Sequence, residues 1–234
     1  AQTNERALLD VVKSAIRDCP PWIRLPRVIR DIPLTYIEGG NMYPNLRQML
    51  EAELKKDGVT IQEIRARECT RHPEYLFDDA VYRVRKYEAS DGTEMFISCE
   101  SEDSVAIFGF LRLRFPSSSS TREFACLTDH TALVRELHVY GNVLPVGTHT
   151  KTHYHDQHRG IGKRLLQMAE SISLWEGYSH IAVISGIGVV EYYKKRGYHS
   201  EDYYMVKTLS HANLFIPLAI LVIVFILTIT AHLS

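Results

Sequence analysis

The chain has 234 residues, of which 45% are hydrophobic and 24% are charged. This composition supports one core, or one core with a small satellite, and it excludes an intrinsically disordered protein. The 27 Lys and Arg residues nearly balance the 28 Asp and Glu residues, so no overall positive field predicts a polyanionic partner, although a local arginine patch stays open. The four cysteines have no CxxC or CxxxC spacing, which favours reduced thiols over a disulfide framework or a thiolate metal site.

Two helices are predicted in the N-terminal third of the chain. Residues Asn4 to Asp18 carry apolar side chains at helical spacing, and Pro20 and Pro21 follow. A second helix is predicted to begin after Asn45 as its cap and to run to Asp57. The proline- and glycine-containing stretch between the two helices predicts an irregular connector.

The middle and C-terminal thirds predict hairpins followed by a βαβαβ order. Three strand-like runs lie at Ala80 to Ala89, Glu94 to Cys99 and Val105 to Phe115, and Asp91 and Gly92 predict a hairpin turn between the first two. The later elements are strands at Ala132 to Tyr140, His180 to Ser185 and Tyr203 to Leu209, and helices at Gly160 to Gly177 and Val189 to Lys195. We therefore expect an α/β fold in which helices pack on a mixed sheet.

The last segment of the chain has a different character. From Leu214 to Leu233 there are 20 residues without Asp, Glu, Lys or Arg, and a helix of that length matches a hydrocarbon core of about 30 Å. This pattern predicts a C-terminal transmembrane helix, a single-pass tail anchor that leaves the preceding domain facing the cytosol. A buried core helix is the alternative, and the sequence does not choose between the mitochondrial outer membrane and the endoplasmic reticulum.

A glycine-bearing turn, DQHRGIGKRLL, lies directly before the longest predicted helix of the α/β region. Gln157, Gly160 and Gly162 form the pattern Q-x-x-G-x-G, and Arg159 and Lys163 add positive charge. The first backbone N–H groups of a helix lack intrahelical partners and favour an anion, and glycines let a pyrophosphate approach them. An ordinary glycine-containing helix start is the alternative interpretation of the same residues.

The surrounding runs make the interpretation more specific. Q-x-x-G-x-G between two strands resembles the acetyl-CoA site of the GNAT acetyltransferase superfamily. The runs VRELHVYG, QHRGIGKRLLQMAE, IAVISGIG, EYYKKRGY and YMVKTL resemble the C-terminal acetyltransferase-like domain of the Elongator catalytic subunit 3 family. Upstream, PPWIRLPRVIRDIPL and NLRQML resemble the segment where the radical-SAM domain of that family meets its GNAT domain. The resemblance implies a GNAT acyl-CoA N-acyltransferase fold at residues 76–209, and the end of a radical-SAM region and a connector at residues 1–75. The membrane tail predicted at residues 214–233 is a departure from the family.

The resemblance also implies a set of site residues. The pyrophosphate of acetyl-CoA would lie at the turn formed by Gln157, His158, Arg159, Gly160, Ile161, Gly162 and Lys163. The strand residues Glu136, Leu137, His138 and Val139 would offer backbone groups to the pantetheine and the acetyl carbonyl, where a donor polarises the thioester. Tyr193, or its neighbour Tyr192, would protonate the departing thiolate, and Glu136 is a candidate base. Aromatic packing by one of the tyrosines, and simple pairing or solvation of Glu136, are the alternatives.

For function, the resemblance implies C5 carboxymethylation of wobble uridines in tRNA, with tRNA and other Elongator subunits as partners. Members of the family also use a [4Fe-4S] cluster and S-adenosylmethionine, but this chain lacks the required cysteine spacing, so it is expected to be a portion of a longer protein or a reduced paralogue. A membrane-anchored lysine N-acetyltransferase and a non-catalytic Elongator scaffold are the competing hypotheses.

Two further sets of residues raise binding hypotheses. The histidine-rich loop from His149 to His158 is expected to be an ordinary polar loop rather than a zinc site. Trp22, Arg24, Arg27 and Arg30 are candidates for RNA contact or for packing against an upstream domain.

Overall fold

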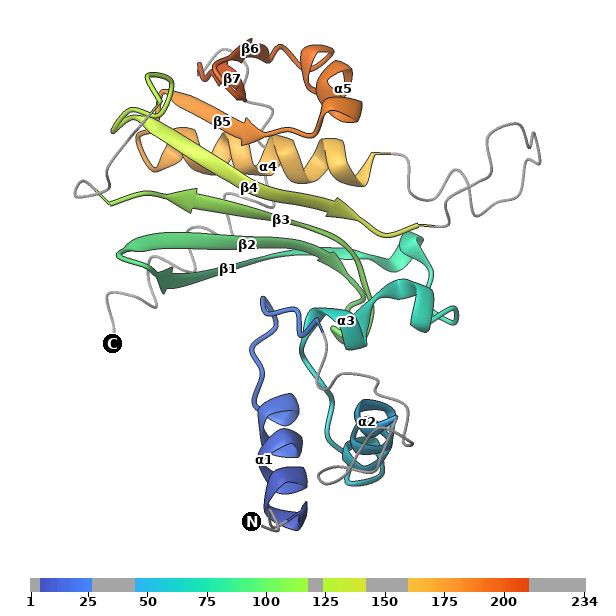
Figure 1. Ribbon diagram of the computed structural model, residues 1–234. Helices are drawn as coiled ribbons and strands as arrows, with labels where there is room; N and C mark the ends of the chain where they lie inside the picture. The colour runs from blue at the N-terminus through green and yellow to red at the C-terminus, as the bar shows by residue number, and fades with distance from the viewer. Residues whose placement is uncertain (1–4, 27–44, 118–123, 142–159, 211–234) are drawn as a thin grey trace, which may run out of the picture. The chain divides into compact units, whose positions relative to one another are not determined.

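A computed structural model describes residues 5–26, 45–117, 124–141 and 160–210 of the chain (Figure 1). The chain divides into two compact units. The N-terminal unit contains Ala1–Tyr82, Cys99–Phe108 and Tyr140–Arg159, and the C-terminal unit contains Arg83–Ser98, Gly109–Val139 and Gly160–Ser234. Each unit is described on its own below.

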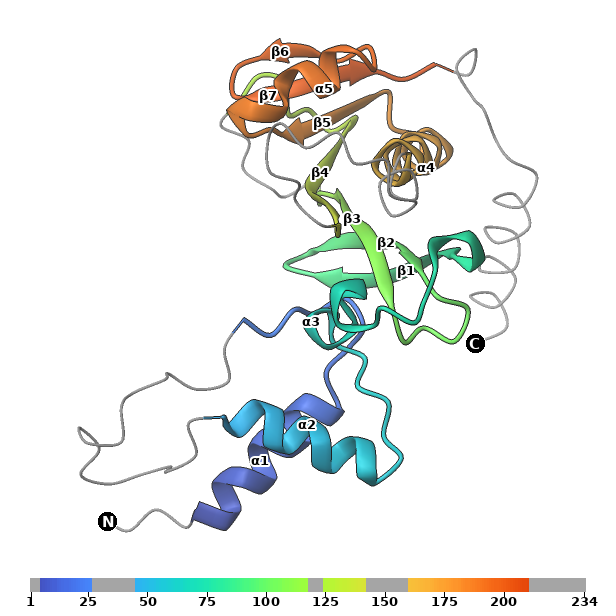
Figure 2. The ribbon, with the colours of Figure 1, turned by 90° about the vertical axis from the view of Figure 1, so that its right-hand side faces the viewer.

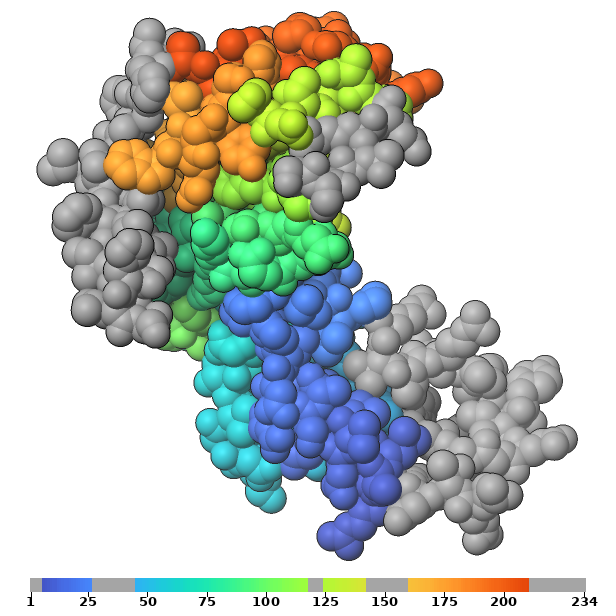
Figure 3. All heavy atoms as spheres, turned by 90° about the vertical axis from the view of Figure 1, so that its left-hand side faces the viewer, coloured from blue at the N-terminus to red at the C-terminus, as the bar shows by residue number. Residues whose placement is uncertain are grey.

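The N-terminal unit is built on a pair of helices, α1 (Glu5–Arg17) and α2 (Leu46–Lys56). They pack side by side (Figure 2), and their side chains adjoin in the space-filling view of Figure 3. Ile16, Leu50 and Leu54 are each 1% exposed at their contact, as the apolar spacing predicted. Asn45 occupies the predicted N-cap position of α2, but its side chain makes no capping hydrogen bond.

Three shorter helical elements follow, none of which the sequence pattern predicted: α3 (Ile64–Arg67), η2 (Cys69–Arg71) and η3 (Phe77–Asp79). Glu63 caps α3 by accepting hydrogen bonds from the backbone N–H groups of Arg65 and Ala66. A single helical turn is too short to show hydrophobic periodicity, so no pattern could have revealed it.

The sheet has seven strands in the order β1-β2-β3-β4-β5-β7-β6. The strands are β1 (Val81–Ala89), β2 (Gly92–Glu100), β3 (Ile107–Phe115), β4 (Thr131–Val139), β5 (His180–Ile184), β6 (His199–Glu201) and β7 (Tyr204–Thr208). β4 pairs in parallel with β5, whereas the pairs β3–β4, β5–β7 and β6–β7 are antiparallel. The mixed sheet is therefore confirmed. β6 was not predicted, because all three of its residues are exposed and carry no apolar pattern.

The hairpin between β1 and β2 turns one residue earlier than predicted. Ser90 and Asp91 have φ values of 48° and 55°, and Gly92 is already the first residue of β2. Two consecutive positive φ angles match the right-handed twist of a hairpin. A methyl group at Gly92 would meet Phe115 O at 2.9 Å, so this glycine serves close strand packing rather than the turn itself.

Helix α4 (Ile161–Trp175) lies along β4 and β5 in the C-terminal unit (Figure 1), and the short helix α5 (Val190–Lys194) follows β5 through η5 (Ile187–Val189). The buried face of α4 includes Ile161, Leu165 and Ala169, each at 0% exposure. These positions recur every four residues, which is the helical spacing that the sequence showed. The helix therefore buries one stripe against the sheet and leaves the opposite stripe to solvent.

The structure contradicts the membrane localisation that was predicted from the C-terminal segment. Within the ranges that the structure describes, there is no helix with both the length and the apolar character needed to cross a bilayer. The predicted span at residues 214–233 lies outside those ranges. The transmembrane part of the predicted fold and the membrane partner are corrected with it.

Candidate functional site

The two parallel strands of the sheet, β4 and β5, are paired only over their first four residues. Their pairing runs from Thr131 opposite His180 to Val134 opposite Val183. β4 continues to Val139, whereas β5 ends at Ile184. The register of β4 against β3 also shifts at this point, since Leu113 pairs with Val134 and Arg112 with Glu136. Arg135 is thus the extra residue of a β-bulge, which redirects the side chains that follow it.

The start of α4 meets the end of β4 at a glycine. A Cβ atom added to Gly162 would lie 2.9 Å from Tyr192 Oη and 3.4 Å from Val139 Cγ2. Real Cβ atoms essentially never approach at the first of these distances. Only glycine therefore lets β4, α4 and α5 converge in this way, and the glycine of the predicted turn is explained by a contact within the protein.

Gly160, in contrast, borders open space. It has a φ of 111° and immediately precedes α4, and a Cβ atom added to it would have no neighbour within 4 Å among the described residues. Its carbonyl accepts from Arg164 N at 2.8 Å, whereas the N–H groups of the first helical turn have no intrahelical acceptor. Ile161 is fully buried, so its side chain belongs to the core, and Lys163 is exposed. Open space beside these N–H groups and a lysine fits an anion.

The two candidate tyrosines have different surroundings. Tyr192 Oη is buried without a hydrogen-bond partner among the described residues, and it lies against Gly162. The Arg196 guanidinium lies 3.4 Å above the Tyr192 ring, and Arg196 Nη1 donates to the Tyr192 carbonyl at 2.5 Å. Burial raises the pKa of the Tyr192 phenol, and Arg196 partly offsets this.

Tyr193 is 5% exposed and packs edge-on against Tyr192 and Tyr198, with ring centroids 5.2 and 5.7 Å apart. Burial raises the pKa of Tyr193 to about 12. Both phenols are therefore neutral proton donors at physiological pH, but the hydroxyl of Tyr192 is the one that contacts the glycine turn. Of the two phenols, only that of Tyr192 is found at this glycine.

The candidate base Glu136 is already paired. Arg112 Nε donates to its carboxylate at 2.9 Å, and the Glu136 side chain is 42% exposed. Arg112 is in turn held over the rings of Phe96 and Phe110, at 5.4 Å from each centroid. The Glu136 carboxylate is thus already engaged by an arginine. The neighbouring predicted strand residues place Val139 at the glycine contact and stack His138 on Phe110 at 5.8 Å, whereas Leu137 is half-buried.

Several predicted residues are outside the described ranges: Gln157, His158 and Arg159 of the turn, the loop from His149 to His158, and Arg27 and Arg30. Among the residues that are described, no group of three or more metal-ligating side chains gathers. Arg24 lies within them and pairs with Glu68 at 3.0 Å, so its guanidinium is engaged inside the N-terminal unit.

The sequence analysis missed two residues that shape the site. Gly109 on β3 allows close packing, since a Cβ there would lie 2.9 Å from the His138 carbonyl and 3.1 Å from Ile161 Cγ2. No local signal marks this glycine. Arg196, which covers Tyr192, follows it by four residues, and that helical spacing could have suggested the contact.

Comparisons with known proteins agree with this geometry. No protein-family profile matches the chain. Elongator complex protein 3 of Bos taurus is 40% identical over 207 residues, which cover 86% of this chain and 37% of that protein. The protein of the same name from Saccharomyces cerevisiae is 38% identical over 205 residues, which cover 86% of this chain and 36% of that one. This chain therefore spans little more than a third of the length of these curated relatives.

A solved structure supports the same conclusion for the fold. The archaeal Methanocaldococcus infernus Elp3 with an N-terminal deletion superposes with a TM-score of 0.74 at 36% identity, covering 88% of this chain and 49% of that one. Identity at this level over most of the chain, together with the shared fold, indicates common descent. The chain is thus similar, over most of its length, to part of Elongator complex protein 3, and it has the mixed α/β fold that the sequence predicted.

Proposed function

We propose that this chain binds acetyl-CoA between the end of β4 and the start of α4, and that it takes part in C5 carboxymethylation of wobble uridines in tRNA. In that reaction it supplies acetyl-CoA binding and acetyl-CoA hydrolysis, as an acyltransferase-type catalytic portion of Elongator. The observation that carries the proposal is the convergence at Gly162. Three features meet there. They are the end of β4 beyond its pairing with β5, the start of α4, and the buried hydroxyl of Tyr192, which has no described partner.

The residues present fit the phosphates and the thioester. The first-turn N–H groups of α4 and Lys163 would hold the pyrophosphate, with Gln157, His158 and Arg159 as further predicted contacts. The backbone of Glu136, Leu137, His138 and Val139 would orient the pantetheine and polarise the thioester carbonyl. Water would attack that carbonyl and lose a proton to solvent, and the C–S bond would break to give acetate and the CoA thiolate. Tyr192, or Tyr193 as the alternative, would protonate the thiolate and regain its proton from solvent.

The organisation of the longer protein is part of the same proposal. Residues 1–75 would be the end of a radical-SAM region and a connector, and residues 76–209 the acetyltransferase-like domain. The [4Fe-4S] cluster and S-adenosylmethionine would be held elsewhere, because the four cysteines here lack the ligand spacing. Partners would be tRNA and other Elongator subunits.

The Arg112 ion pair bears on the competing hypothesis of a conventional lysine N-acetyltransferase. Such an enzyme deprotonates an ammonium group before transfer, and the best-placed carboxylate, Glu136, is held by an arginine. Hydrolysis by water with a phenol as the acid makes no demand for a lysine substrate. The engagement of Glu136 by Arg112 therefore favours hydrolysis over transfer to a lysine amine.

The test is acetyl-CoA turnover by this chain alone, with tRNA added, and with a lysine-bearing peptide added. We expect hydrolysis that rises with tRNA and no acetyl transfer to the peptide. Transfer to peptide that is indifferent to tRNA would establish the acetyltransferase instead. Acetyl-CoA binding without any turnover in all three conditions would support a non-catalytic scaffold.

A further inference from the structure

The bulge in β4 is held by side chains from the three strands beside it. Arg135 extends across β3, and its Nη1 donates to Oε1 of Glu94 on β2. Glu94 is 1% exposed, and it also accepts from Tyr87 Oη of β1 at 2.7 Å and from Arg114 Nη1 of β3 at 3.2 Å. Strands two apart in a sheet are separated by about 9–10 Å, so a long side chain is needed to join β2 with β4.

The residue after Arg135 is held from β3. Arg112 donates through Nε to Glu136 at 2.9 Å and through Nη1 to Tyr87 Oη at 3.3 Å. The hydrogen bonds therefore form a closed ring, which runs from Glu94 through Tyr87, Arg112 and Glu136 and returns through Arg135. Two adjacent residues of the bulge are thereby tied to two different strands.

The position of this bulge decides how the end of β4 faces the start of α4. Beyond the bulge, Gly109 of β3 pairs with Val139, whereas without the extra residue it would pair with His138. A slip of one residue turns the side chains of a strand to the other face of its sheet. Val139 would then leave Gly162, where its Cγ2 lies 3.4 Å from the position of an added Cβ.

The bulge also decides which backbone N–H groups of β4 point toward the edge that β5 has left. Tyr140 N donates to Phe108 O of β3 at 2.9 Å. Successive N–H groups of a strand point to opposite edges, so those of Val139 and Leu137 point away from β3. The pairing of β4 with β5 ends at Val134, and a slip of one residue would turn the neighbouring N–H groups to that edge instead.

We propose that Glu94 is a positioning residue for acetyl-CoA hydrolysis. Through Arg135 it fixes the bulge, and the bulge sets which N–H group of β4 faces the thioester carbonyl. The inference rests on the proposed function and deepens it, since a donor stabilises the developing oxyanion only when it is aimed at that oxygen. Glu94 lies on β2 and acts through Arg135 rather than on the substrate.

The first experiment measures the register of the free chain by nuclear magnetic resonance. In the isotope-labelled 234-residue chain we expect a cross-strand Hα–Hα contact between Gly109 and Val139, which is typical of a pair without mutual hydrogen bonds. Arg135→Gln and Glu94→Gln should each weaken this contact and give a new one between Gly109 and His138. Arg135→Lys keeps the charge and should restore the original contact. An unchanged register in both glutamine variants would overturn the inference, whatever their activity.

The second experiment separates acetyl-CoA binding from turnover. At saturating acetyl-CoA, hydrolysis should fall at least about tenfold in Arg135→Gln and in Glu94→Gln, because the donor is misplaced. The Kd from calorimetric titration should change less than about twofold, since the donor acts mainly in the transition state. Arg135→Lys should recover most of the rate, which a general loss of stability would not predict.

Glu88→Gln is the matched control in the same hairpin. Glu88 is exposed and accepts from Thr93 Oγ1 at 2.9 Å, and it takes no part in the ring. The variant should keep the register, the affinity and the rate of the unmodified chain. Turnover by the unmodified chain with an unchanged rate in both ring variants would refute the inference alone, whereas failure of the unmodified chain to bind acetyl-CoA would refute the proposed function as well.

Discussion

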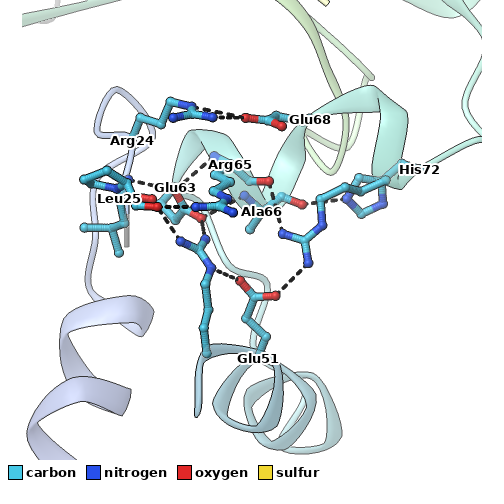
Figure 4. Close-up of polar contacts among 11 residues, drawn as sticks. Arg24, Leu25, Glu51, Glu63, Arg65, Ala66, Glu68 and His72 are labelled. Atoms are coloured by element: carbon cyan, nitrogen blue, oxygen red, sulfur yellow. Dashed lines mark hydrogen bonds and ion pairs between the residues drawn. The ribbon is translucent and has the colours of Figure 1, made fainter. Parts of the chain in front are cut away.

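Two polar regions of this chain differ in whether their groups are satisfied. In the N-terminal unit, Glu63 is fully buried and accepts hydrogen bonds from Leu25 N at 3.1 Å, Arg65 N at 2.9 Å and Ala66 N at 2.8 Å, together with one from Arg47 (Figure 4). In the α4–α5 region, Tyr192 Oη and Arg196 Nε are buried without partners in the described parts of the chain. The buried carboxylate of the first region has its hydrogen-bond partners within the protein, whereas two buried polar atoms of the second region do not.

The carboxylate of Glu51, next to the Glu63 network, also has its hydrogen-bond partners within the protein. Arg47 also donates to Glu51 at 2.6 Å, and Arg71 donates to the other oxygen of Glu51 at 2.8 Å. Figure 4 shows Glu51 of α2 and Glu63 at the start of α3, with their hydrogen bonds drawn as dashed lines. A network with each carboxylate satisfied holds elements together and has no group left to offer a ligand. Unpartnered buried groups beside a glycine turn are instead expected where a ligand binds.

Removing Glu63 should give the largest effect on stability. Glu63→Ala leaves the guanidinium of Arg47 and three backbone groups without their acceptor, and we expect the free energy of unfolding to fall by about 3–5 kcal/mol. Urea denaturation followed by circular dichroism measures this. The control is Glu53→Ala, which removes an exposed ion pair with Lys13 at 3.2 Å and should cost far less, because solvent screens exposed charges. Equal losses for the two variants would contradict the distinction.

In the α4–α5 region, a substitution at the glycine turn should lower the affinity for acetyl-CoA. Gly162→Ala places a methyl group 2.9 Å from Tyr192 Oη, and we expect acetyl-CoA affinity to fall about 100-fold because the turn and the phenol can no longer both keep their positions. Calorimetric titration measures the affinity. Gly188→Ala, where an added Cβ meets nothing within 4 Å, is the control for stability. Unchanged affinity in Gly162→Ala would refute the proposed site.

The two tyrosines should separate stability from turnover. Tyr192→Phe removes a buried hydroxyl with no described partner, so the free energy of unfolding should rise by about 1 kcal/mol. The rate of acetyl-CoA hydrolysis should fall at least about tenfold in the same variant, since the acid is lost. Tyr193→Phe keeps the aromatic packing and should leave hydrolysis unchanged. Loss of hydrolysis in Tyr193→Phe alone would restore Tyr193 as the acid.

The smallest effect on stability near neutral pH comes from ionisation. The network around Glu63 should lose stability in acid, whereas the α4–α5 region should lose it in alkali. Burial alone would raise the pKa of Glu51, but the hydrogen bonds from Arg71 and Arg47 outweigh it and hold that pKa below 4.5. The stability that Glu51 contributes is therefore present above its unfolded pKa and lost as pH falls through the lowered value.

Tyr193 behaves in the opposite sense. Burial raises its pKa from 10.0 to about 12, so its contribution is complete below pH 10 and is lost as pH rises toward 12. Melting temperatures measured against pH check both directions, and phenolate absorbance reports the tyrosine. Tyr193→Phe should make the alkaline loss less steep. An alkaline profile identical to that of the unmodified chain would show that Tyr193 is not the group involved.

The local patterns of the sequence determined the helices α1, α2 and α4 and the strands β1 to β5 and β7. Apolar spacing in these elements reflects burial on one face, which any packed arrangement of them requires. The runs around QHRGIGKRLL likewise indicated a GNAT-like fold and a likeness to the Elongator catalytic subunit 3. The same reasoning from a charge-free C-terminal segment gave a membrane localisation that the structural finding contradicts, since no helix among the described residues could cross a bilayer. The segment itself lies outside those residues.

Only the tertiary structure decided which groups of the site meet. The bulge at Arg135, the separation of β4 from β5 after Val134, and the approach of Tyr192 to Gly162 all depend on residues far apart in the chain. The sequence placed two adjacent tyrosines at the site with Tyr193 favoured, whereas the fold turns the hydroxyl of Tyr192 to the glycine and packs Tyr193 against Tyr198. Local propensity acts over a few residues, and partners across a sheet are fixed by packing, so this choice was not available from the sequence.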